Sequence, residues 1–146
     1  MFNEDEIKNL FQYQYGQRYT FSTLALLYPS LDFRNKFHQD HVFPKCFFAK
    51  KKLIKKGIEE NRVAFYLSNF NTLPNLQLLE GVPNQEKLDT DFKEWVYKTY
   101  PKQQDRKNYM EKNYIPDIDL SFNNFENFIS ERKKLMAGKF KSLLKL

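Results

Sequence analysis

Polar side chains that could act together on a phosphate ester fall at the junctions between expected elements of structure. Asp40 and His41 stand at the end of one expected strand. Asn75 opens a second strand, and Asn84 lies in the first turn of the helix expected after it, with Lys87 one turn further on. A hairpin followed by a packed helix would bring these junctions together.

The residue types suit hydrolysis of a phosphodiester. This reaction needs a base for water, a cation for the phosphate charge and a group that holds the base in one tautomer. His41 supplies the base, since a neutral imidazole has an ordinary pKa of ~6.5. Mg²⁺ takes few protein oxygens and keeps several waters, which suits the Asp40 carboxylate and the Asn84 amide oxygen. Asn75 either orients the imidazole or braces the hairpin.

Each of these residues also has a structural interpretation. An isolated histidine such as His41 is more often a core residue bonded to a backbone carbonyl, Asn75 suits a turn, and Asn84 suits a helix start. Their joint placement favours function. His38 shares strand parity with Asp40, so it is a secondary candidate. It either reaches the metal or phosphate or makes a structural hydrogen bond.

The chain is basic, because 24 Lys and Arg against 18 Asp and Glu give a formal charge of +6. Such an excess attracts polyanions, and nucleic acid is the natural partner. Together with Lys87, the expected DNA contacts are lysines that crowd after the histidine segment: Lys45, Lys50, Lys51, Lys52 and Lys55. The alternative is a solvated helix face with Leu53 and Ile54 turned inward, and the sequence leaves both interpretations open.

Helices and two short strands are expected to position these side chains. Apolar spacing predicts helices over 5–15, 21–28, 47–68 with a break at Gly57, from Pro83 to just before Pro101, over 102–113 and from Asn123 onward. Residues 33–43 are expected to be extended, and 76–79 to form the second strand. Gly16 is the expected stop of the first helix, Glu126 the expected capping-box partner of the last, and Gly138 a weak point within it.

The bulk properties indicate one folded domain over 1–146, since 146 residues suit one domain and a 17% aromatic content argues against disorder. We divide it into a helical lead-in (1–34), a core with both strands and a helical insertion (35–100), and C-terminal helices (101–146). Cys46 is the only cysteine, so no disulfide forms within the chain. The lack of a signal peptide and of an apolar stretch of ~20 residues predicts a cytoplasmic protein with no membrane partner.

Taken together, the motifs resemble those of HNH endonuclease domains, also called His-Me finger or ββα-metal nucleases. Segment 37–45, Phe-His-Gln-Asp-His-Val-Phe-Pro-Lys, is similar to their Asp-His-Ile-x-Pro opening. Segment 75–79, Asn-Leu-Gln-Leu-Leu, followed by Asn84 nine positions after Asn75 and then by Lys87, is similar to their second half. The closest likeness is to the C-terminal nuclease domain of GmrSD-like, modification-dependent (type IV) restriction enzymes.

The resemblance implies an α+β fold in which a ββα-metal motif is embedded among α-helices. It implies hydrolysis of DNA phosphodiesters with Mg²⁺, for which Mn²⁺ can substitute. His41 would be the base, with Asn75 in support, and Asp40 and Asn84 would hold the metal. Asn84 stands where some members have His, and Cys46 where Ser is common.

The resemblance also implies a biological setting. Such domains serve restriction and anti-phage defence, with DNA as substrate and an NTPase domain or subunit upstream as partner. The alternative function is a catalytically inactive DNA-binding or docking module of a larger defence protein.

Overall fold

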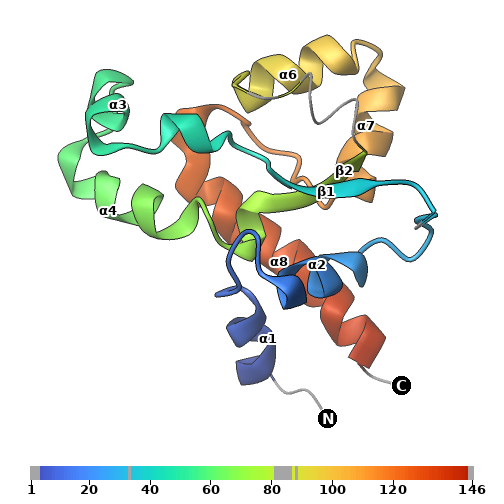
Figure 1. The fold of residues 1–146 in the computed structure, drawn as a ribbon. Coiled ribbons are helices and arrows are strands. Elements are labelled where there is room, and N and C mark those ends of the chain that lie inside the picture. Colours follow the sequence, from blue (N-terminus) through green and yellow to red (C-terminus); the bar gives the residue numbers. More distant parts are fainter. Residues whose placement is uncertain (1–3, 33, 81–86, 88, 145–146) are drawn as a thin grey trace.

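A computed structural model gives the fold, and the structure describes residues 4–32, 34–80, 87 and 89–144. Within those residues, helices surround a single antiparallel pair of strands (Figure 1). The α+β class predicted from the sequence is confirmed.

Short helices come first, then a hairpin whose connection is itself helical, then longer helices. In chain order the elements are α1 (Glu4–Leu10), α2 (Arg18–Ala25), β1 (Phe37–His41), η1 (Lys45–Phe47), α3 (Lys50–Lys55), α4 (Glu60–Asn69), η2 (Leu73–Asn75), β2 (Leu76–Glu80), α6 (Phe92–Thr99), α7 (Gln103–Lys112), η3 (Phe122–Asn124) and α8 (Phe125–Leu144).

The segment after α1 is not helical, so the prediction of a helix to residue 15 is wrong. Its backbone groups bond instead to the loop before β2. The amide of Leu73 donates to the carbonyl of Tyr13 (2.9 Å), and the amide of Tyr15 donates to the carbonyl of Asn71 (2.8 Å). Apolar spacing alone does not reveal these long-range partners. The second helix is also displaced, covering residues 18–25 rather than 21–28.

The hairpin pairs β1 with β2 in antiparallel register, with Asp40 opposite Gln77 and His41 opposite Leu76. The second strand is confirmed, whereas the first is shorter than the extended segment expected over 33–43. Successive side chains leave opposite faces of a strand. Asp40 therefore shares a face with Gln77, and His41 shares the other with Leu76.

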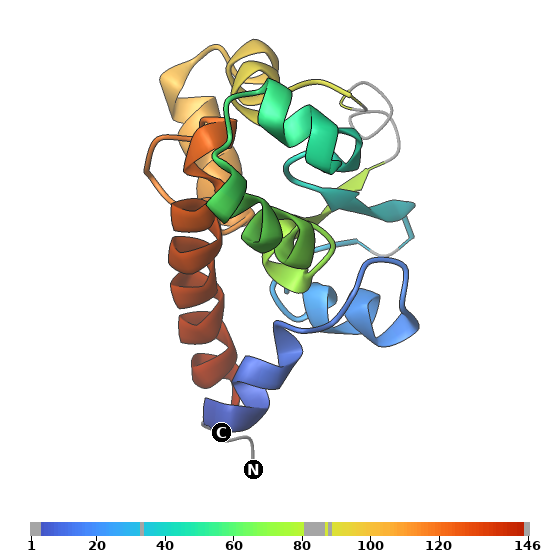
Figure 2. The same ribbon diagram turned by 90° about the vertical axis from the view of Figure 1, so that its left-hand side faces the viewer.

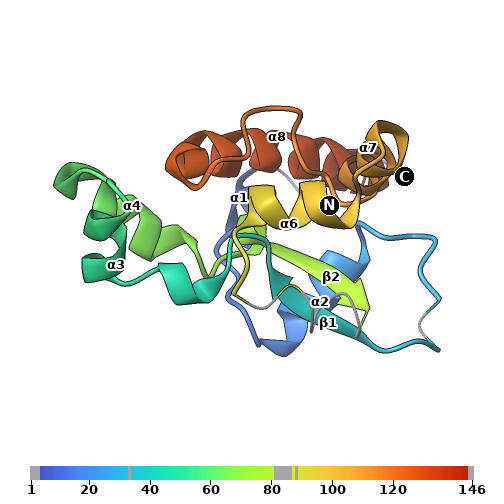
Figure 3. The ribbon, with the colours of Figure 1, turned by 90° about the horizontal axis from the view of Figure 1, so that it is seen from above.

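The connection between the strands forms α3 and α4, which lie to one side of the hairpin (Figures 1 and 3). The expected break at Gly57 is confirmed: its φ of +87° is in the left-handed region that favours glycine. The helix expected from residue 47 begins only at Lys50. A 3₁₀ turn and two irregular residues precede it, so the predicted start is wrong.

The chain after β2 does not form one continuous helix up to Pro101 as expected, although α6 does end before Pro101, at Thr99. Lys87 is helical, Asp89 lies in a turn, and α6 begins anew at Phe92. The Asp91 carboxylate accepts a hydrogen bond from the amide of Glu94, as an N-cap does. Among the predicted site residues, Asn84 lies outside the described residues, as does Pro83.

Helix α8 begins near α4, lies below α6 and α7 in the view of Figure 2, and ends beside α1 (Figures 1 and 2). Gly138 does not interrupt it. The capping-box prediction for Glu126 is wrong, because its carboxylate bonds to the Arg62 guanidinium on α4 (2.6 Å). No described helix combines the length and the apolar character needed to cross a membrane.

Two apolar clusters hold the hairpin from its two faces. Leu79 joins the cluster that contains Phe43, Trp95 and Phe128, whereas Leu78 joins the one with Leu24 and Phe140. Side chains of α8 belong to both clusters. The end of β1 is therefore fixed against a packed scaffold on either side, which is where the candidate residues lie.

Candidate functional site

The end of β1 borders an open hollow of about 600 Å³. Asp40 and His41 both line it, although they leave opposite faces of the strand. Its other polar or aromatic lining residues include Tyr15, His38, Lys45, Cys46, Lys52 and Asp89. Residues from three separate stretches of the chain thus meet around the predicted base and the predicted metal ligand.

The His41 imidazole is oriented by Asn71. Its Nε2 atom lies 2.9 Å from Asn71 Oδ1. The Asn71 amide group donates its own Nδ2–H to Gln14 Oε1 (3.3 Å), which fits the oxygen facing the ring. An amide oxygen only accepts, so the ring carries its proton on Nε2. Nδ1 is then the atom with the free lone pair, as a general base requires.

The imidazole is also enclosed by aromatic rings. Its centroid lies 4.4 Å from that of Tyr15 and 6.2 Å from that of Phe70. Burial lowers the pKa of His41 below its ordinary value, while the hydrogen bond with Asn71 and the charge of Asp40 oppose the shift. The neutral, proton-accepting form is therefore the one favoured at neutral pH.

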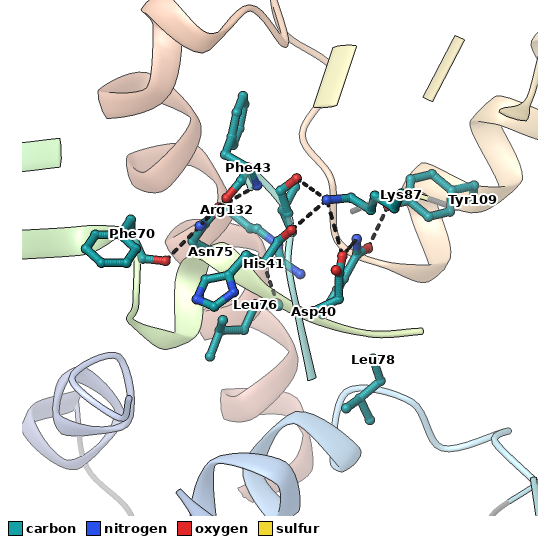
Figure 4. A network of polar contacts seen from close by, with 12 residues as sticks. Asp40, His41, Phe43, Phe70, Asn75, Leu76, Leu78, Lys87, Tyr109 and Arg132 are labelled. Atoms are coloured by element: carbon teal, nitrogen blue, oxygen red, sulfur yellow. Dashed lines mark hydrogen bonds and ion pairs between the residues drawn. The ribbon is translucent and has the colours of Figure 1, made fainter. Parts of the chain in front are cut away.

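The Asp40 carboxylate is held by a chain of buried polar groups (Figure 4). Gln77 Nε2 donates to its Oδ2 at 3.0 Å, and Lys87 Nζ lies 3.3 Å from the same atom. Gln77 is itself fixed by the Tyr109 hydroxyl, which donates to Gln77 Oε1 at 2.6 Å. Among the described residues, this network fixes the carboxylate through its Oδ2 atom alone.

Lys87 is fully buried, and its ammonium donates to the carbonyls of His41 (2.6 Å) and Val42 (2.7 Å) as well as facing Asp40. Burial lowers its pKa, and the charge of Asp40 opposes that shift. The prediction that Lys87 contacts DNA is wrong, since a side chain with no exposed surface cannot reach a phosphate. It fixes the end of β1 instead, as Figure 4 shows.

The sequence left two roles open for Asn75: to orient the imidazole or to brace the hairpin. The structure supports the second. Its Oδ1 accepts from the amide of Phe43 (3.0 Å), and its Nδ2 donates to the carbonyls of Phe43 (3.1 Å) and Phe70 (2.8 Å). The residue is fully buried. Asn71, not Asn75, hydrogen-bonds the imidazole, so of the two roles left open for Asn75 the structure supports the bracing one.

The residues fit a magnesium ion in part. Both described contacts of Asp40 end on Oδ2, so within the described residues its Oδ1 accepts no hydrogen bond and the side chain borders the hollow. One carboxylate oxygen suits a cation that keeps most of its waters. Across residues 4–32, 34–80, 87 and 89–144, no three His, Cys, Asp or Glu side chains converge as a ligand group.

The expected surface lysines Lys45, Lys50, Lys51, Lys52 and Lys55 are all exposed. Lys45 and Lys52 line the hollow, and Lys52 Nζ also donates to the Cys46 carbonyl (2.8 Å). Lys50 pairs loosely with Glu60 on α4 (3.6 Å). The alternative was a solvated helix face with Leu53 and Ile54 turned inward. Leu53 is buried as that interpretation requires, whereas Ile54 is exposed.

His38 lies at the rim of the same hollow and is exposed. It shares a face of β1 with Asp40, as strand parity predicted. Within the described part of the chain its side chain makes no hydrogen bond, so of the two roles left open the structural one has no counterpart there.

Sequence reasoning missed Asn71, Gln77 and Tyr15. Asn71 belongs to the loop before β2 and stands four positions before Asn75, so a second asparagine in that loop was the available signal. Gln77 could have been found from strand parity, because a polar side chain in an otherwise apolar strand calls for a buried partner. No local pattern points to Tyr15.

Comparison with known proteins adds no family assignment: no family model matches the chain, and no curated protein matches it.

Proposed function

We propose that the protein is a metal-dependent endonuclease that hydrolyses DNA phosphodiester bonds. One observation carries the proposal: the imidazole of His41 is held with Nδ1 as its unprotonated nitrogen, and it lines a hollow that Asp40, Lys45 and Lys52 also line. A positioned base, a carboxylate and cationic side chains are the groups that phosphodiester hydrolysis needs.

In this proposal His41 Nδ1 takes a proton from a water molecule as the water oxygen bonds to phosphorus. The bond from phosphorus to the 3′ oxygen breaks, and that oxygen leaves with the bonding electrons. Asp40 and Asn84 would hold Mg²⁺, or Mn²⁺ in its place, and the cation supplies positive charge for the phosphate and the leaving oxygen when bound. Lys45 and Lys52 attract the DNA backbone.

The finer fold assignment belongs to the same proposal. Two features support a ββα-metal motif. One is the antiparallel hairpin, and the other is the helical residue Lys87, whose ammonium donates hydrogen bonds to carbonyls at the end of β1. By resemblance of the motifs, the biological role is restriction of foreign DNA, together with an NTPase domain or subunit. That setting places the protein in the cytoplasm.

A nicking assay tests the activity. With supercoiled plasmid and Mg²⁺ or Mn²⁺, we expect nicking that EDTA abolishes. Replacing the base by His41→Ala, or the ligand by Asp40→Asn, should lower the rate at least about 100-fold. Asn108→Ala, an exposed change on α7, is the matched control and should leave the rate unchanged. Plasmid binding without nicking, indifferent to His41→Ala, would show instead a DNA-binding module without catalysis.

A further inference from the structure

We propose that Tyr15 forms a stacking site for one unpaired nucleobase next to the scissile phosphate, so that the preferred substrate is DNA with an unpaired segment. The proposal rests on the proposed function, since it takes a DNA strand to be the occupant of the hollow.

The Tyr15 ring combines contact with the base and exposure to solvent. Its centroid lies 4.4 Å from that of the His41 imidazole, with 34° between the ring planes. Yet 43% of the residue remains exposed, and it lines the hollow. An aromatic side chain that packs only to orient a neighbour does not need such exposure. The remaining ring surface is available to a ligand that stacks.

The ring is held on a fixed backbone. The amide of Tyr15 donates to the carbonyl of Asn71, the residue whose side chain orients His41. The next amide, of Gly16, donates to Gln39 Oε1 on β1 (2.9 Å). Gly16 has a φ of +84°, so it serves a tight turn rather than the helix stop expected from the sequence. Tyr15 and the imidazole are thus positioned by one loop, as parts of one site.

Two lysines near the ring favour a nucleotide over a neutral aromatic ligand, and the carboxylates of Asp40 and Asp89, which line the same hollow, offset only part of the protein's positive charge. Lys45 and Lys52 are exposed on the same hollow, and the protein as a whole has a charge of +6. A nucleobase and its phosphate are joined by a single sugar. A base stacked on Tyr15 therefore leaves its phosphate close to the adjoining imidazole and within the field of the lysines.

The base must be unpaired because both faces of a base within a duplex are covered by its neighbours. Side chains that stack on bases accordingly act on single strands or on bases taken out of the helix. The geometry thus points to single-stranded DNA, or a single-stranded segment beside a duplex, as the substrate class.

Fluorescence of 2-aminopurine tests the stacking directly. Single-stranded oligonucleotides carrying this base at successive positions are bound to the protein in EDTA, so that no cleavage occurs. We expect quenching at one position with the native protein and with Tyr15→Phe, which keeps the ring. Quenching should be lost with Tyr15→Leu, and affinity should fall about tenfold, the order of one stacked base. Tyr19→Leu removes a similarly exposed tyrosine, whose ring pairs with Tyr13 instead, and should change neither.

A second measurement separates stacking from a purely structural role. An abasic nucleotide placed at the quenched position should weaken binding about tenfold for the native protein and leave the affinity of Tyr15→Leu unchanged, since the partner ring is already absent. Equal losses in both proteins would overturn the proposal, as would quenching that survives Tyr15→Leu. Because binding is measured without metal, failure of the nuclease proposal appears separately, as absence of nicking.

Discussion

The Nε2 atom of His41 lies 2.9 Å from the Oδ1 atom of Asn71, thirty positions along the chain. The contact joins the last residue of β1 to the loop that leads into β2. It determines which ring nitrogen carries the proton, and therefore which one can accept a proton from water. The chemistry proposed for His41 thus depends on a residue that touches neither phosphate nor metal in the proposed mechanism.

Substitution of Asn71 is expected to act through the imidazole. Asn71→Leu removes the acceptor, so the ring loses its preferred tautomer and the nicking rate should fall by about 100-fold. The hydrogen bond raises the pKa of His41, so its removal should also lower that pKa further. NMR titration measures this without any activity, and the chain has only 2 histidines to assign.

Asn71→Asp provides the opposite change. It keeps an oxygen acceptor and adds a negative charge beside the ring, so the pKa of His41 should rise. The acidic limb of the nicking profile should move to higher pH, because the base must be neutral to act. Asn61→Asp places the same charge at an exposed position of α4 and is the control. Unchanged titration of His41 in both Asn71 variants would remove Asn71 from the site.

The depressed pKa of His41 has a consequence for stability. The unfolded chain protonates this residue near its ordinary value of ~6.5, whereas the folded chain does so only at lower pH. The contribution of His41 to the unfolding free energy should therefore be constant above pH ~6.5. It should decrease as the pH falls from ~6.5 toward the pKa of His41 in the folded protein. His41→Gln should abolish that part of the decrease in urea denaturation measured across the range. A slope identical to that of the native protein would contradict a buried, neutral His41.

Asn75 should affect folding more than catalysis. Its three hydrogen bonds satisfy backbone groups of Phe43 and Phe70 in a buried setting. Asn75→Ala leaves these groups unpaired, and the unfolding free energy should fall by about 3 kcal/mol. Asn108→Ala, on the exposed face of α7, should change it by less than about 0.5 kcal/mol. Denaturation that does not distinguish the two variants would contradict the bracing role.

Lys87 is expected to behave as a buried ion-pair partner. Lys87→Met removes the ion pair with the Asp40 carboxylate and the hydrogen bonds to the carbonyls of His41 and Val42. This loss should destabilise the protein by about 3 kcal/mol. Lys93→Met removes an exposed ammonium that pairs with Asp119 and should change stability by less than about 1 kcal/mol. Equal melting temperatures for the two variants would contradict the burial of Lys87.

Much of the arrangement could be predicted from local signals. The second strand followed from a compact apolar run, and the helix break from Gly57. The order of strands and helix predicted that the polar junctions come together, and Lys87, which follows the third junction, lies 3.3 Å from Asp40. These features depend on residue types and spacing within a few positions, which a sequence displays directly.

The roles within the site depended on distant packing and could not be predicted in the same way. Asn71 precedes the turn η2 and Asn75 is its last residue, and only Asn71 faces His41. Lys87 looked like one more surface lysine. Its ammonium lies beneath the rings of Phe92 and Trp95, with centroids 5.9 and 5.7 Å away, and charge pattern alone gives no sign of that enclosure.

The salt dependence of DNA binding distinguishes lysines that contact phosphates from lysines that lie on a solvent-exposed helix face without contacting DNA. Each phosphate contact contributes about 0.7 to the slope of log affinity against log salt for single strands, and about 0.9 for duplex DNA. Lys45 and Lys52 line the hollow, so the double change to Gln should lower the slope by about twice that contribution. Lys107→Gln, on the exposed surface of α7, should leave it unchanged. If the slope of the double variant equals that of the native protein, neither lysine contacts the DNA backbone, and both belong to a solvated surface.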